Sequence, residues 1–133
     1  MEVLKKVFQN QIPKGDFYIK LYNSEDESLT VQLYDFNYFV FVTFKRYKAI
    51  RMIEEGMLLM NYIYSAPEFE KYKQDDFVNT IYEIIGGTYV KYLDEINNNN
   101  LRTNEMHAYI FVTMNYVTEI VTDTIPHFEV INR

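Results

Sequence analysis

The sequence predicts an α+β domain with an N-terminal helix, an antiparallel meander packed with one long helix, and C-terminal strands. Two patterns lead to this fold class. Segments in which apolar and polar residues alternate, as in strands, are interleaved with segments in which apolar residues recur every three or four positions, as in helices. With 48% hydrophobic residues, a chain of 133 residues can bury one core, so we expect a single domain over residues 1–133.

An apolar stripe at helical spacing runs along the first twelve residues. Its members are Val3, Leu4, Val7, Phe8 and Ile12. This spacing predicts a short amphipathic helix, which the Pro13 and Gly15 that follow would end.

Strict alternation of apolar and polar residues begins at residue 17. One side of this run carries Phe17, Ile19 and Leu21, and the other carries Tyr18, Lys20 and Tyr22. The acidic stretch 23–28 follows, and a second alternating run begins at residue 29. Two such runs joined by a short polar loop predict an antiparallel hairpin whose wet face carries tyrosines.

The stretch 38–44 is apolar on both faces, which predicts a central strand that is covered on both sides. Residues 45–64 fit two patterns, a continuation of the meander or a helical stripe, and we favour the meander. Between residues 68 and 97 apolar residues recur at helical spacing, which predicts the long helix. The pair Gly86-Gly87 inside it implies either a close packing contact or a break.

The last third of the chain is rich in Val, Ile, Thr, Tyr and Phe, the residues that favour strands. We therefore expect residues 106–114 and 116–122 to form two paired strands, although a helical spacing also fits the region 105–123. Pro126 ends either structure.

The formal net charge is −6 and the pI is about 4.9. An acidic surface repels phosphates and anionic lipids, so we expect neither nucleic acid nor membrane as a partner, and another protein of basic character is favoured. The chain has no cysteine, and its first residues do not resemble a secretory signal, which together predict a cytoplasmic location.

One motif needs separate treatment. The stretch NYFVFVTF, residues 37–44, matches five of the eight positions of a consensus found in RNA-recognition-motif domains, and so resembles that family over eight residues. Asn37 stands where the consensus is basic, and Tyr38 and Val40 stand where it is small. The hairpin just before it also differs from the order of elements in that family. We therefore interpret the stretch as a core strand whose aromatic side chains stack on helices of the domain itself.

Residues suited to catalysis are scarce. The chain has two histidines, His107 and His127, and no spacing typical of metal ligands, nucleophile elbows or phosphate-binding loops. We expect no catalytic residue, no cofactor and no metal.

These observations predict a small acidic, non-catalytic protein-binding module, of the inhibitor or immunity type or a phage or virus accessory protein that blocks its partner. The alternative is a structural or assembly protein that forms a homo-oligomer; the order of elements is loosely similar to that of type III secretion chaperones. An enzyme is the less favoured hypothesis. The predicted interface combines the wet tyrosines with a basic run that no acidic residue interrupts, and its residues are Tyr18, Tyr22, Tyr34, Lys45, Arg46, Lys48 and Arg51.

Overall fold

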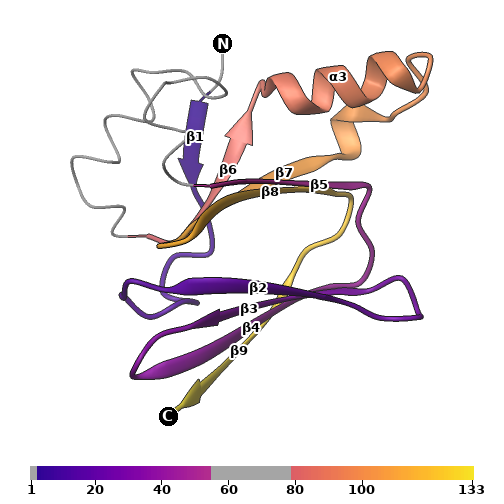
Figure 1. Cartoon of the computed structure of the whole chain (residues 1–133). Coiled ribbons are helices and arrows are strands. Elements are labelled where there is room, and N and C mark those ends of the chain that lie inside the picture. Colours follow the sequence, from indigo (N-terminus) through magenta and orange to yellow (C-terminus); the bar gives the residue numbers. More distant parts are fainter. Residues whose placement is uncertain (1–2, 55–78) are drawn as a thin grey trace.

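Nine antiparallel strands in two sheets are the main elements of the chain that the computed structural model describes, residues 3–54 and 79–133 (Figure 1). The four-stranded sheet has the order β2 (Tyr18–Asn23), β3 (Leu29–Tyr34), β4 (Tyr38–Phe44), β9 (His127–Asn132). The five-stranded sheet has the order β1 (Val3–Lys6), β6 (Ile81–Ile85), β7 (His107–Val112), β8 (Tyr116–Thr122), β5 (Ala49–Glu54).

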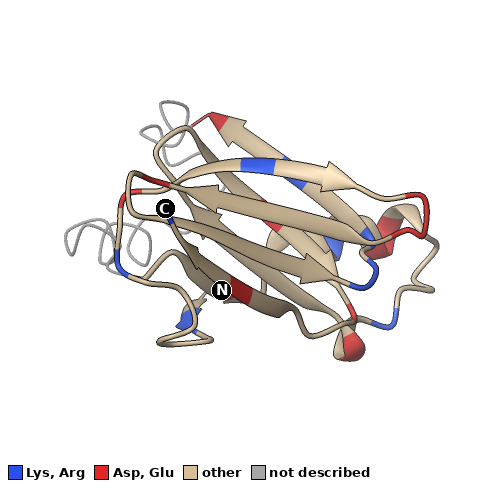
Figure 2. Ribbon diagram, turned by 90° about the horizontal axis from the view of Figure 1, so that it is seen from below, with Lys and Arg blue, Asp and Glu red and all other residues tan. Residues whose placement is uncertain are grey.

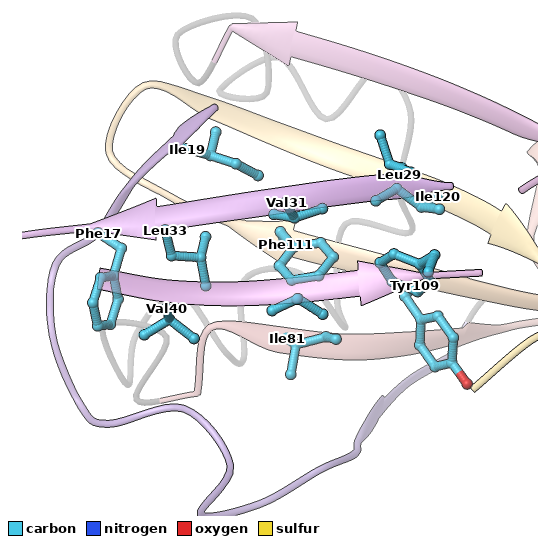
Figure 3. Packing of buried hydrophobic residues seen from close by; sticks show 12 residues of the cluster. Phe17, Ile19, Leu29, Val31, Leu33, Val40, Ile81, Tyr109, Phe111 and Ile120 are labelled. Atoms are coloured by element: carbon cyan, nitrogen blue, oxygen red, sulfur yellow. The ribbon is translucent and has the colours of Figure 1, made fainter. Parts of the chain in front are cut away.

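The main core lies between the two sheets. Alternate residues of the four-stranded sheet point inward and are fully or almost fully buried, and Figure 3 shows them against side chains of the five-stranded sheet. The residues on the first sheet are Ile19, Leu29, Val31, Leu33, Val40, Val42 and Phe44, and those on the second are Ile81, Tyr109, Phe111 and Ile120. The two sheets therefore form a β-sandwich.

A second apolar layer lies on the other side of the five-stranded sheet. The helix α3 (Thr88–Ile96) crosses this outer face (Figure 1), and the 3-10 turn η1 (Thr103–Glu105) follows it. Tyr89, Val90 and Leu93 of the helix pack against residues such as Tyr82 and Ile110 of the sheet. The five-stranded sheet is thus covered on both faces, which explains why β8 is buried almost throughout.

The predicted N-terminal helix is wrong. Residues 3–6 form the edge strand β1, which pairs with β6 in the register Leu4 to Ile84. Phe8 and Asn10, with φ of 52° and 71°, adopt the left-handed backbone conformation, which a right-handed helix does not contain. The apolar stripe arises because Val7, Phe8 and Ile12 pack against the main core from a turn.

The predicted long helix is also wrong over its described part. Residues 81–85 form strand β6, which lies between β1 and β7, and only Thr88–Ile96 is helical. Gly86, with a φ of 69°, turns the chain between the two elements in a conformation that favours glycine. Since the described chain is mostly β, with one helix of nine residues, the α+β class is corrected to a β-sandwich. The expectations for residues 55–64 and 68–78 lie outside the described residues.

Other segments follow the strand interpretation. The hairpin of β2 and β3 is present, and β4 continues the meander. Residues 49–54, 107–112 and 116–122 are strands, so the helical alternatives for these regions are wrong. The prediction that the meander continues beyond β4 is also wrong over its described part, because β5 pairs with β8 in the five-stranded sheet. The strand β9, which follows Pro126 and pairs with β4, is absent from the elements predicted from sequence. This pairing places β4 inside the four-stranded sheet.

The two sheets are also joined by hydrogen bonds at the edge of β2. The Asn115 side chain, in the turn between β7 and β8, accepts a hydrogen bond from the Ile19 amide at 3.1 Å and donates one to the Ile19 carbonyl at 3.3 Å. The Met114 amide donates to the Phe17 carbonyl at 2.8 Å. These bonds occupy backbone groups that an edge strand would otherwise offer to another chain.

Candidate functional site

The outer face of the four-stranded sheet is the candidate site, and we call it the aromatic face. It consists of the outward-pointing residues that alternate with the buried ones: Tyr18, Lys20 and Tyr22 of β2, Thr30, Gln32 and Tyr34 of β3, Phe39, Phe41 and Thr43 of β4, and His127, Glu129 and Ile131 of β9. Because the sheet is regular, these residues form three rows across the four strands.

Aromatic side chains on this face contact one another. The rings of Tyr18 and Tyr34 stack with centroids 5.7 Å apart, and those of Phe39 and Phe41 lie 6.4 Å apart. Cations lie over two of the rings, since Lys20 Nζ is 5.3 Å from the centre of Tyr34 and the Arg133 guanidinium is 4.4 Å from that of Phe39. Such contacts fix the rings in place on an exposed sheet surface.

Among the described residues, no element covers the aromatic face. Figure 1 shows α3 on the far side of the five-stranded sheet, with the lower surface of the four-stranded sheet open. Tyr18, Tyr22 and Ile131 are 45%, 48% and 42% exposed. Figure 2 shows the molecule from this side, where the strands carry few charged residues and an acidic turn lies at one end of the sheet. An exposed aromatic surface of this kind is typical of a binding site.

Phe39 and Phe41 belong to the stretch NYFVFVTF, and the interpretation of this stretch needs correction. The sequence pattern predicts that its aromatic residues are covered by the domain's own helices. Val40, Val42 and Phe44 do point into the core, but Phe39 and Phe41 point to the opposite side, where no described helix lies. The two phenylalanines are therefore part of the candidate site, although they are not among the interface residues predicted from sequence.

The tyrosines Tyr18, Tyr22 and Tyr34 lie on the aromatic face together, as their alternation predicts. The basic residues do not join them in one surface. Lys45, Arg46 and Lys48 lie in the connection between β4 and β5, and Arg51 lies on β5 of the other sheet.

Two of the four basic residues are paired with acidic residues of the same chain. Arg46 Nε donates to Asp123 Oδ1 at 2.9 Å, and this hydrogen bond lowers the pKa of the Asp123 carboxyl. Arg51 Nη2 donates to Glu119 Oε1 at 2.7 Å. The predicted basic patch is thus divided between two parts of the molecule.

The Arg51–Glu119 pair lies on the covered face of the five-stranded sheet. The Glu119 side chain is fully buried, and the Arg51 guanidinium lies 4.4 Å from the centre of the Tyr89 ring of α3. The Tyr89 hydroxyl donates to the Ile50 carbonyl at 3.2 Å, and burial raises the pKa of this hydroxyl. These contacts tie α3 to β5 and β8, which is a structural role.

Of the two histidines considered as catalytic candidates, His107 lies beside a carboxylate. Its Nδ1 lies 2.8 Å from Glu83 Oε2, and its ring stacks on that of Tyr109, whose pKa is raised by burial. A cavity of about 520 Å³ between β6, α3 and η1 is lined by Glu83, Lys91, Asp94 and Glu95 among others, but by neither histidine. In residues 3–54 and 79–133 no three potential metal ligands of the His, Cys, Asp and Glu types cluster together.

Comparisons with protein families, with curated proteins and with solved structures find no match to this chain. Within the described part of the chain, no helix has the length and apolar character needed to cross a membrane. The candidate site is therefore argued from its geometry alone.

Proposed function

We propose that this protein is a non-catalytic protein-binding module and that the aromatic face is its interface. The observation that supports this proposal is the cluster of aromatic residues on the four-stranded sheet, which no element of the described chain covers. Tyrosine and phenylalanine are enriched in protein interfaces, because they bury a large apolar area and lose little conformational entropy. The polar members of the rows, such as Gln32 and Thr30, supply hydrogen-bonding groups between the rings.

The charges of the face favour a protein over a nucleic acid. Single-stranded nucleic acids also stack on aromatic residues, but their sites combine the rings with a basic groove. Here Lys20 and Glu129 stand in the same row, and the whole chain has a net charge of −6. A face with one basic and one acidic residue in its middle row is suited to bind a protein surface that is partly polar and partly apolar.

Inhibition of a partner, as in an immunity-type protein or a phage or virus accessory protein, is one way in which such a module acts, and assembly of a homo-oligomer is the other. The acidic turn 24–28 at the end of the β2–β3 hairpin favours a partner with basic residues around its apolar contact area. A cytoplasmic location is part of this proposal and is supported by the absence of cysteine.

Serine at positions 18, 22 and 34 should weaken binding to the partner, because it removes three exposed or half-buried rings from the aromatic face. The wild type, the Y18S/Y22S/Y34S variant and a Tyr92→Ser control are used as baits in native lysate. Tyr92 lies on α3, on the opposite side of the molecule, and is 55% exposed. The Tyr92→Ser control therefore removes a tyrosine of similar exposure from a surface outside the aromatic face. The recovered protein is then purified and titrated by calorimetry, with an expected loss of at least about tenfold in affinity for the triple variant only.

The melting temperatures of wild type, the triple variant and the Tyr92→Ser control verify that the substitutions leave the fold intact. The proposal fails if the triple variant binds the same protein as tightly as wild type does. The proposal also fails if wild type recovers nucleic acid from the lysate and the triple variant does not.

A further inference from the structure

We infer that the partner of the aromatic face is a second copy of this chain, packed face to face about a two-fold axis that runs parallel to the strands of the four-stranded sheet. The inference rests on the proposed function, because it concerns the same face. It follows from how the side chains and charges are distributed over the three rows.

The register defines which residues share a row. The first row is Tyr18, Tyr34, Phe39 and Ile131; the second is Lys20, Gln32, Phe41 and Glu129; the third is Tyr22, Thr30, Thr43 and His127. Within each row the residues lie in the order β2, β3, β4, β9. One row is apolar, the middle row has opposite charges at its two ends, and the third is polar.

A two-fold axis parallel to the strands reverses the order of the strands but keeps each row opposite itself. The strand β2 then faces β9 of the second copy, and β3 faces β4. Tyr18 meets Ile131 of the second copy, and Tyr34 meets Phe39, over whose ring the Arg133 guanidinium lies. The side chains that face one another in the first row are therefore aromatic or aliphatic. Sheets that pack face to face keep their strands within about 30° of each other, which this arrangement allows.

The charges select this axis over the alternative. With the axis parallel to the strands, Lys20 lies opposite Glu129 of the second copy, and the contact occurs twice because of the symmetry. With an axis in the same plane but perpendicular to the strands, Lys20 would lie opposite Lys20 and Glu129 opposite Glu129. Like charges in such positions disfavour association.

The loops at one end of the four-stranded sheet also carry opposite charges that this axis brings together. The turn 24–28 and Lys45 lie at the same end, because Leu29 pairs with both Asn23 and Phe44. Asp26 accepts hydrogen bonds from the Ser28 hydroxyl and amide at 2.7 and 3.1 Å, which hold the turn and lower the pKa of the Asp26 carboxyl. The strand-parallel axis brings this acidic turn to the end of the second copy's sheet that carries Lys45.

The size of the face indicates the strength of the dimer. Four strands with three outward residues each cover about 400 Å² of flat area at the usual strand spacings. This is about half of the roughly 800 Å² per partner that standard stable complexes bury. We therefore expect a weak, reversible dimer with a dissociation constant of about 10–100 μM.

The test is a charge exchange measured by sedimentation equilibrium. Within one chain, Lys20 and Glu129 are separated by three strand spacings, about 14 Å, which is too far for an ion pair. Lys20→Glu and Glu129→Lys should each weaken the dimer by at least about tenfold, because each creates two like-charge contacts. The double variant K20E/E129K should restore the wild-type dissociation constant.

Lys91→Glu on α3 is the control, since it changes the net charge as K20E does but lies away from the aromatic face. Its dissociation constant should stay within about twofold of wild type. The inference is overturned if wild type is monomeric at about 1 mM, well above a micromolar constant. It is also overturned if the exchange fails to restore dimers that the single variants lose, or if the single variants dimerise as wild type does. A monomer that still captures another protein through the tyrosines would leave the proposed function intact and remove only this inference.

Discussion

Replacing Phe44 by alanine should lower the free energy of unfolding by about 3–5 kcal/mol, the usual cost of removing a buried aromatic side chain. Phe44 is fully buried between the sheets, where its ring centroid lies 6.0 Å from that of Tyr109 and 6.4 Å from that of Phe111. The cavity that the truncation leaves has walls on two rigid sheets, which limits collapse. Urea unfolding followed by circular dichroism measures the loss.

Phe41→Ala is the matched control, because it removes the same side chain from the same strand on the opposite face. Phe41 is partly exposed and contacts Phe39, so its truncation should cost about 1 kcal/mol in a monomer. Dilute protein is needed for this comparison, since self-association would add to the stability of wild type. Equal losses for Phe44→Ala and Phe41→Ala would contradict the assignment of an inner and an outer face.

Replacing Arg51 by methionine should destabilise the protein by about 3 kcal/mol, because it removes the cation that faces a buried carboxylate. The Glu119 side chain is fully buried, whereas that of Arg51 is 24% exposed. Methionine keeps much of the packing of Arg51 against Tyr89, so the loss reports mainly on the ion pair. The same urea titration measures it.

The double variant R51M/E119L provides the control for this pair. Replacing both partners of a buried ion pair by apolar residues is often close to neutral, so the double variant should recover most of the stability that Arg51→Met loses. Additive losses in the double-mutant cycle would show that the two side chains do not act as a pair.

The fold could be predicted from the sequence where alternation is strict and local. Residues 17–23 and 29–34 alternate without a break, and the hairpin and its register follow from that pattern. Prediction failed where the apolar residues of a strand also fit helical spacing. In 81–85 the residues Ile81, Ile84 and Ile85 also fit helical spacing, and the pairing of this segment with β1 and β7 decides its structure.

The candidate site could be predicted in part for the same reason. Tyr18, Tyr22 and Tyr34 alternate with buried residues, so sequence placed them on one face. Phe39 and Phe41 alternate with the equally apolar Val40 and Val42, which conceals the outward direction of the phenylalanines. The basic run 45–51 crosses from one sheet to the other, so residues that are neighbours in sequence lie on different surfaces.

The central claim is that the aromatic face binds a second copy of the chain, and NMR spectra of ¹⁵N-labelled protein recorded over a dilution series test it most directly. Between about 1 mM and about 10 μM, a micromolar dimer dissociates substantially, and the amide shifts of interface residues change with it. We predict the largest changes along β2, β3, β4 and β9, with little change in α3. Changes centred on α3 and the five-stranded sheet, or no change at any amide, would contradict the claim that a second copy binds this face.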